Sequence, residues 1–204
     1  MQLLAEGLEG LAPAGDPVCE ALAKLAGLVA QWAPRMNLTA HRTAESVARR
    51  LILDAVALDA ALPAGVDSLV DVGSGAGFPG LPLAILHPER RIVLIEARER
   101  RHHFQRMAIR ALGLTNVEAR HGRAESLSPS LHDVGIAQAA ATPAEAVLLL
   151  LPWVRPGGCS SSRVERTPRK WADGRKSRAQ RHGTTRYRLG ARCDPSGSGE
   201  SANK

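Results

Sequence analysis

Four glycines lie within eight residues in the stretch LVDVGSGAGFPGLPLAIL, which runs from 69 to 86. Hydrophobic residues flank them on both sides, a pattern typical of a strand, a tight loop and a helix in succession. Glycine is needed where the backbone turns with a positive φ or where a ligand approaches the main chain closely. The loop is therefore a candidate site for a phosphate, a dinucleotide or another nucleoside cofactor.

Two ligand classes fit the spacing of this loop. Residues 75–80, GAGFPG, match the dinucleotide fingerprint GxGxxG. Residues 71–77, DVGSGAG, have the spacing of S-adenosylmethionine (SAM) sites. SAM is favoured, because its ammonium and sulfonium groups accommodate Asp71, whereas a dinucleotide site does not require an acid there. Pro79 and Pro82 also remove two N–H donors that a pyrophosphate would use.

A second acid lies at the end of the next hydrophobic run. Glu96 follows Gly77 by 19 residues, and a carboxylate there can accept hydrogen bonds from both hydroxyls of a ribose. NAD and SAM both carry that ribose, so Glu96 does not choose between them. A solvated strand end is the alternative interpretation of Asp71 and of Glu96. The segment GRAES at 122–126 could meet an adenine edge, although a polar loop is the simpler interpretation.

The elements that must position these residues alternate from residue 67 onward. The strands are expected over 68–72, 90–97, 116–122 and 133–139, and the helices over 79–86, 98–113 and 142–154. Thr142 is the expected N-cap of the last helix, with Pro143 at its first position. Repeated units of this length predict a doubly wound α/β fold with a parallel sheet and right-handed crossovers.

Two helices are expected ahead of the sheet. Apolar residues recur at helical spacing over 18–33, and Pro34 is expected to end that helix. Thr43 is the expected N-cap of a second helix over 44–62, which should stop at Pro63.

The composition fits one soluble globular domain. The chain has 204 residues, of which 44% are hydrophobic but only 3% aromatic, so an aliphatic core is expected. No apolar run approaches the ~20 residues of a membrane span, and the first residues do not resemble a signal peptide. The three cysteines are far apart and indicate neither a disulfide framework nor a zinc site. A cytoplasmic location is the default expectation.

The excess positive charge is confined to the end of the chain. Residues 159–204 hold 12 Lys or Arg and 4 Asp or Glu, a net charge of +8, whereas residues 1–158 carry a net charge of −1. We therefore expect a helical segment over 1–65, an α/β domain over 66–158, and an aberrant tail over 159–204 that is frame-shifted or disordered.

The genetic code supports a frame shift. If the serines of Cys-Ser-Ser-Ser at 159–162 use TCN codons, reading one nucleotide earlier gives four codons with a central T, which encode apolar residues. A buried strand would then follow Gly158, as the helix–turn pattern before it demands. A genuine basic tail that binds RNA is the alternative.

Several stretches together resemble the bacterial RsmG (GidB) methyltransferases, which methylate N7 of a guanine in 16S ribosomal RNA. They are NLTAHR at 37–42, RRLILDAVAL at 49–58, LVDVGSGAGFPGLPLAILHP at 69–88, IVLIEARERRHHFQR at 92–106 and HGRAES at 121–126. The resemblance implies a Rossmann-like SAM-dependent methyltransferase fold with an N-terminal helical extension, whose C-terminal strands are lost or aberrant here. It also implies SAM as cofactor and 16S rRNA or the small ribosomal subunit as partner.

The resemblance and the spacing together give a set of candidate cofactor-binding residues. The set is Asp71, Gly73, Gly75, Gly77, Phe78, Glu96, Ala124, Glu125 and Gln138. The resemblance implies that Glu96 takes the ribose, and that Ala124 and Glu125 border the adenine. Gln138 stands where the family has the arginine of a Ser-Arg-Ala triplet, so it can form hydrogen bonds but carries no charge.

Basic residues before and within the expected helix 98–113 are candidates for the RNA backbone. They are Arg42, Arg49, Arg101, His102 and Arg106, and a solvated helix face is the alternative. No catalytic residue is assigned, because guanine N7 has a free lone pair and alignment can supply most of the rate. We expect a monomer without metal. The rival functions are a nicotinamide oxidoreductase and an inactive RNA-binding remnant.

Overall fold

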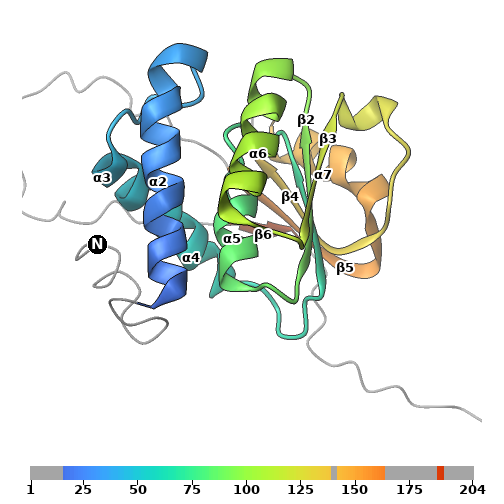
Figure 1. The fold of residues 1–204 in the computed structure, drawn as a ribbon. Coiled ribbons are helices and arrows are strands. Elements are labelled where there is room, and N and C mark those ends of the chain that lie inside the picture. The colour runs from blue at the N-terminus through green and yellow to red at the C-terminus, as the bar shows by residue number, and fades with distance from the viewer. Residues whose placement is uncertain (1–15, 139–141, 164–187, 191–204) are drawn as a thin grey trace, which may run out of the picture.

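The computed structural model describes residues 16–138, 142–163 and 188–190 (Figure 1). The described strands are β1 (Ser68–Val72), β2 (Arg91–Glu96), β3 (Val117–His121), β4 (His132–Gln138), β5 (Val154–Arg163) and β6 (Arg188–Gly190). They form one sheet in the order β3-β2-β1-β4-β5-β6. The first five strands are parallel, and β6 pairs antiparallel with β5. The predicted doubly wound parallel sheet is confirmed, and its order reverses between β1 and β4, where such folds open a crevice for ligands.

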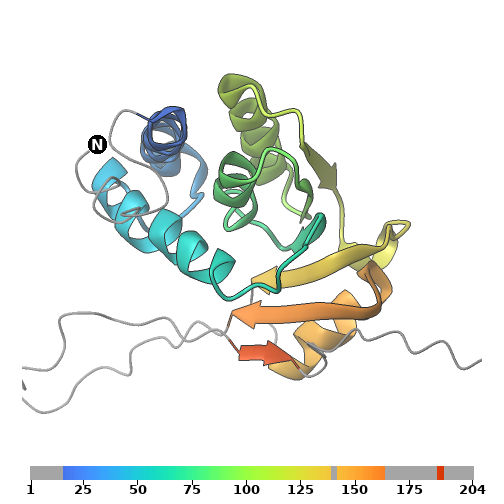
Figure 2. The same cartoon turned by 90° about the horizontal axis from the view of Figure 1, so that it is seen from below.

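Helices cover both faces of this sheet. They are α2 (Pro17–Met36), α3 (Ala44–Val47), a π-helical turn (Ala48–Ile52), α4 (Leu53–Asp59), α5 (Gly80–Leu86), α6 (Glu99–Leu112) and α7 (Pro143–Leu150). Short 3-10 turns follow β3 and α7, at Ala124–Ser126 and Leu151–Trp153. Figures 1 and 2 show α2, α4, α5 and α6 on one side of the sheet and α7 on the other.

The first helix ends later than predicted. Pro34 was expected to stop it, but α2 continues to Met36. A proline in the last turn removes only one intrahelical hydrogen bond, and Asn37, in the left-handed region at φ 50°, closes the helix by donating to the carbonyl of Ala33 at 3.0 Å. Asp16 is the N-cap of this helix, and its carboxylate accepts a hydrogen bond from the N–H of Val18.

The second predicted helix is interrupted by a π turn. The Thr43 cap is confirmed, since its hydroxyl accepts from the N–H of Ser46 at 3.1 Å in a capping box. The wider turn over Ala48–Ile52 then lets Val47 and Ile52, five residues apart, both point into the core, where each is 0% exposed. A regular helix would have carried Ile52 away from that face.

The N-terminal helices and the sheet share one hydrophobic core. Side chains of α2 such as Leu22 and Leu25 pack in the same cluster as Leu69 of β1 and Ile92 of β2. A smaller cluster on the other face joins the strands to α7 and includes Trp153. The N-terminal helices are therefore part of the layer that supports the glycine loop.

Strand β5 crosses the position where the aberrant tail was expected to begin. Its backbone continues to Arg163, with Val134 of β4 opposite Cys159 and Ala137 opposite Ser162. The central strands of parallel sheets are usually near-continuous apolar runs, and Cys-Ser-Ser-Ser is not one. The frame-shift hypothesis stays a prediction, and residues 164–187 and 191–204 lie outside the described residues.

In the part of the chain that the structure describes, no helix is long and apolar enough to cross a membrane.

Candidate functional site

The glycine loop follows β1 at the sheet edge where the strand order reverses. Gly73, Gly75 and Gly77 have φ of 72°, 57° and 87°, a region that side chains other than glycine rarely adopt. A Cβ at Gly77 would also clash with the side chain of Leu81. At Gly75 the nearest atom to a built Cβ is Arg101 Nη1, at 3.8 Å. The backbone conformation thus requires these three glycines, as the sequence predicts.

Glu96 joins this loop to the loop after β2. Its Oε2 accepts from the N–H of Gly75 at 2.9 Å, and its Oε1 accepts from the N–H of Arg98 at 2.7 Å. The side chain is 5% exposed, so Glu96 is not a solvated strand end. Each carboxylate oxygen has a second lone pair, and a ribose contact therefore stays compatible with both bonds.

Asp71 lies deeper than a simple ligand contact would require. Its Oδ2 accepts a hydrogen bond of 3.1 Å from the N–H of Gly80 at the start of α5. Asp71 is 0% exposed. Burial raises the pKa of the Asp71 carboxyl well above its usual range. Its Oδ1 has no hydrogen-bond partner among the described residues. Asp71 thus fastens the loop to α5, and its predicted contact with a cofactor remains a prediction.

Two further polar residues hold the loop, and the sequence analysis did not single them out. Gln105 of α6 donates from Nε2 to Ser74 Oγ and to the carbonyl of Gly75, both at 2.8 Å. Ser74 Oγ donates in turn to the carbonyl of Ile95 at 3.2 Å. The signal that could have found Gln105 is an amide directly beside Phe104, the one aromatic residue of the expected helix 98–113.

The loop uses most of its own N–H groups. Gly73 and Ser74 donate to Ile95 O, Gly75 to Glu96, Gly77 and Phe78 to Ser74 O, Gly80 to Asp71, and Leu81 to Gly77 O. Apart from Pro79, which has no N–H, only Ala76 between 73 and 81 has an N–H without an acceptor among the described residues. The loop therefore offers bare backbone but almost no free amide donors.

The other predicted cofactor residues lie along the same edge of the sheet or under it. Phe78 is 4% exposed and Ala124 7% exposed, whereas Glu125 is exposed and lies 3.8 Å from Arg123. Gln138 ends β4, one residue beyond Ala137, which is opposite Val72 of β1. The backbone thus brings position 138 beside the glycine loop.

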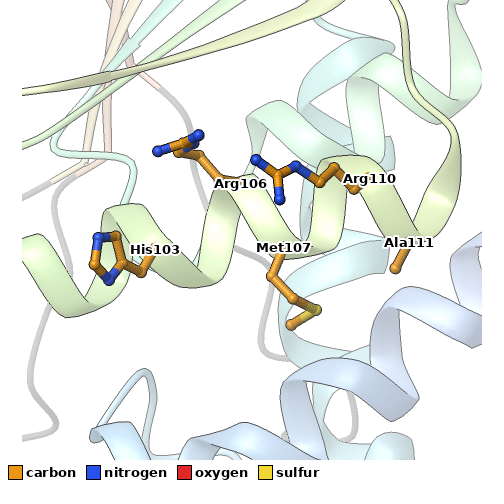
Figure 3. Close-up of a pocket in the computed structure, with 5 residues that line it drawn as sticks. All are labelled: His103, Arg106, Met107, Arg110 and Ala111. Carbon is orange, nitrogen blue, oxygen red and sulfur yellow. The ribbon is translucent and has the colours of Figure 1, made fainter.

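A row of basic side chains runs along the outer face of α6. His103, Arg106 and Arg110 are exposed, and with Met107 and Ala111 they line a depression of about 500 Å³ (Figure 3). Among the described residues neither arginine has an ion-pair partner. Unpaired guanidinium groups in a row suit a series of phosphates.

The predicted RNA-binding residues have different surroundings. Arg42 is exposed, and Arg49 is exposed but paired with Glu45 at 3.2 Å. Arg101 is half-buried beside Gly75 and approaches the carbonyl of Asn37 at 3.5 Å. Arg106 belongs to the exposed row described above.

His102 is not on that basic face, contrary to the sequence interpretation. Its residue is 9% exposed, its Nε2 donates to the carbonyl of Ala119 at 3.2 Å, and its ring stacks on His121 at 5.1 Å. Burial lowers the pKa of the His102 imidazole. The neighbouring His103 occupies the outward position, because the helix turns 102 toward β3.

Within residues 16–138, 142–163 and 188–190, no three His, Cys, Asp or Glu side chains gather closely enough to hold a metal ion.

The family model and the curated relatives that match this chain agree on one family. The family model described as rRNA small subunit methyltransferase G (GidB) matches residues 18–162. Three similar relatives are all named ribosomal RNA small subunit methyltransferase G. The protein of Halorhodospira halophila is 40% identical over 125 residues, covering 61% of this chain and 59% of that protein. The protein of Lachnoclostridium phytofermentans is 36% identical over 137 residues, covering 64% and 57%.

The third relative extends the match slightly further. The protein of Leptothrix cholodnii is 35% identical over 151 residues, covering 72% of this chain and 69% of that protein. Against the first two, the matched part of the chain spans less than three fifths of the relative's length. The family model ends at residue 162, the last serine of the Cys-Ser-Ser-Ser run.

Proposed function

The chain belongs to the GidB family of small-subunit rRNA methyltransferases, and from this premise we propose that it transfers a methyl group from SAM to N7 of a guanine in 16S rRNA. One observation carries the choice of cofactor. The loop at the β1–β4 crevice combines three positive-φ glycines and a buried acceptor, Glu96, with almost no free N–H groups.

This combination favours SAM over a dinucleotide. A pyrophosphate is bound by several free backbone N–H groups at a helix N-terminus. Here the N–H of Gly80 is taken by Asp71 and that of Leu81 by Gly77, while Pro79 and Pro82 have none. SAM carries no phosphate, so the loop can bind it through close backbone contact alone. The nicotinamide oxidoreductase is therefore the weaker candidate.

The residues present fit the two ends of this cofactor. In the proposal Glu96 accepts hydrogen bonds from the ribose hydroxyls through its remaining lone pairs, and the turn at Ala124 and Glu125 borders the adenine. The glycines of the loop admit the methionine end, and Gln138, where β4 ends near the loop, stays a candidate contact for it.

No residue has to act as an acid or a base. SAM supplies a methyl group on a positively charged sulfur, which the lone pair of guanine N7 can take without any loss of a proton. The chain contributes by holding the two reactants in line, which can account for most of the rate. The target base has to be presented single-stranded or flipped out of its stack.

The RNA-binding proposal now rests on a corrected set of residues. Arg101 borders the glycine loop, and the exposed row of His103, Arg106 and Arg110 continues away from it along α6. A strand of RNA could follow this row from the crevice, with Arg42 and Arg49 as further contacts. The proposal includes a monomer that acts in the cytoplasm, where ribosomal RNA is found.

Calorimetry with the full chain tests the cofactor. We expect S-adenosylhomocysteine (SAH) to bind in the micromolar range and NAD not to bind. Gly75→Val should weaken SAH binding at least 100-fold, because a β-branched residue rarely adopts a φ of 57°. Binding of NAD instead of SAH, or undiminished SAH binding in the variant, would contradict the proposal. Transfer of labelled methyl groups to small-subunit RNA, read out at guanine N7, tests the reaction.

A further inference from the structure

Gln105 of α6 is a polar residue at a position that packing alone would fill with an apolar side chain. The residue is 0% exposed and lies next to Phe104, within the face of α6 that covers the sheet. Its amide nitrogen makes two hydrogen bonds of 2.8 Å, both to the glycine loop. All of the side chain's observed hydrogen bonding is thus directed at the candidate cofactor loop.

The orientation of this amide is fixed by its partners. A backbone carbonyl can only accept, so the NH₂ group must face Gly75 and the Oε1 must point away from it. That Oε1 is buried and has no hydrogen-bond partner among the described residues. An unpaired buried carbonyl is unfavourable for folding. The amide of Gln105 therefore lowers the stability of the fold, and its contact with the loop is the function that it can serve in return.

The loop contains three glycines, which lose more conformational freedom on ordering than any other residue. The peptide groups around Gly75 are restrained from two sides: Glu96 accepts from its N–H, and Gln105 donates to its carbonyl. Gln105 also binds Ser74 Oγ, which is itself bonded to Ile95 of β2. The loop is thus held between β2 and α6 before any ligand arrives.

We propose that Gln105 is a positioning residue that presets the glycine loop for its nucleoside ligand, and so sets the affinity for SAM without touching it. Preorganisation of this kind raises affinity by removing the entropy of ordering the loop on binding. The inference rests on the proposed function for the identity of the ligand, but the state of the loop can be measured without one.

Gln105→Met tests this directly, because methionine keeps the length and lack of branching and removes the amide. We expect the Kd for SAH to rise about tenfold, by calorimetry, while the melting temperature stays level or rises. Hydrogen exchange of the Gly75–Gly77 amides in the ligand-free protein should speed up at least tenfold, with β2 amides unchanged. In methyl transfer, the KM for SAM should rise and the KM for RNA should not.

Asn116 offers a matched control, since its amide also ties backbone segments together on this side of the sheet. Its Nδ2 donates to the carbonyls of Ala84, His87 and Arg90 at 2.9–3.1 Å, near the C-terminal end of α5. Asn116→Ala should lower the melting temperature and leave the Kd for SAH within twofold of wild type. A merely structural role for Gln105 would give the same pattern in both variants.

The outcomes separate the two proposals. If the wild-type chain does not bind SAH, the proposed function fails. If the wild type binds SAH and Gln105→Met binds it within twofold, with unchanged exchange at Gly75–Gly77, the inference on Gln105 is wrong. Should Gln105→Met not fold, Ser74→Ala removes one of the two acceptors, and wild-type affinity and loop exchange in that variant would overturn the inference.

Discussion

The glycine loop and strand β5 belong to the same parallel sheet, the loop after β1 and β5 beside β4, but their sequences suit these places unequally. The loop is fastened by named side chains: Asp71 from β1, Glu96 from β2 and Gln105 from α6 each bind its backbone. Strand β5 pairs with β4 and β6, its first residues make side-chain contacts such as the ion pair of Arg155 with Asp133, and its last half reads Cys-Ser-Ser-Ser-Arg. The residue types of the loop suit their surroundings, whereas Cys-Ser-Ser-Ser is not the apolar run that an inner strand of a parallel sheet usually has.

We infer from this difference that the loop determines cofactor binding, whereas β5 determines the stability of the sheet. The side chains that support the loop come from residues 71–105, well inside the family match, whereas the Cys-Ser-Ser-Ser run of β5 lies at the end of that match. A parallel sheet also needs apolar side chains on its inner strands, because helices cover both faces. We therefore expect changes in and around β5 to alter stability while the loop's affinity for SAH changes little.

The largest effect is expected from restoring the reading frame after Gly158. Inserting one nucleotide between codons 158 and 159 should replace Cys-Ser-Ser-Ser with four apolar residues. We expect the melting temperature to rise by roughly 10 °C, or about 3 kcal/mol for a chain of this size, because β5 gains a buried apolar strand. Methyl transfer to small-subunit RNA should appear or rise strongly, with the Kd for SAH within threefold.

Sequencing the DNA across codons 156–162 provides the control for this experiment. An unbroken frame with no apolar alternative, or a restored chain that melts no higher, would show that the two regions do not differ in this way. A genuine basic tail would then be the better interpretation of residues 159–204.

The framework of the site was predictable because it depends on local pattern. The range 68–72 was predicted exactly as β1 is observed, and Thr43 and Thr142 form the predicted caps, each with a capping box. The glycines at 73, 75 and 77 indicated where the backbone could turn with a positive φ, and the structure has a positive φ at all three. Local sequence rules are enough where one residue type is required by the local backbone, as at a helix N-cap or at a positive φ.

The side-chain network was not predictable in the same way. The bond from Gln105 to Gly75 joins residues 30 positions apart, and the burial of His102 depends on its contact with Ala119. The π turn at Ala48–Ile52 adds one residue to a helical turn, so that Ile52 points into the core. A regular α-helix would place Ile52 away from the core. Such features follow from tertiary packing and not from spacing.

Lowering the pH should weaken the region around β4 and β5 more than the loop. His132 starts β4 with 0% exposure, and burial together with the charges of Arg91, Arg120 and Arg155 lowers its pKa to about 4. The native state therefore keeps His132 neutral, while the unfolded state takes up a proton below pH ~6.5. Stability is full above that pH and should fall by up to about 3 kcal/mol between pH 6.5 and 4.

Urea unfolding at several pH values measures this slope, and His132→Leu should remove most of it. At pH 7.5, where His132 is neutral in both states, the variant reports only the cost of the substitution itself. An unchanged slope in His132→Leu would assign the acid sensitivity to other groups. The Kd for SAH at pH 7.5 should stay within twofold of wild type, since His132 lies at the N-terminal end of β4, far from the glycine loop at the C-terminal ends of the strands.

The smallest effect is expected from a single substitution in β5. Ser161 is opposite Ile136 on β4 and Leu189 on β6, so its backbone is paired on both sides. Ser161→Val should stabilise the chain by about 1 kcal/mol, because β-branched apolar residues are favoured in inner strands. Ser128→Val, in an exposed loop, is the matched control and should give no gain. If Ser161→Val instead lowers the melting temperature, β5 does not require an apolar residue at position 161. The polar sequence of β5 would then not be a source of instability, in contrast to what we infer here.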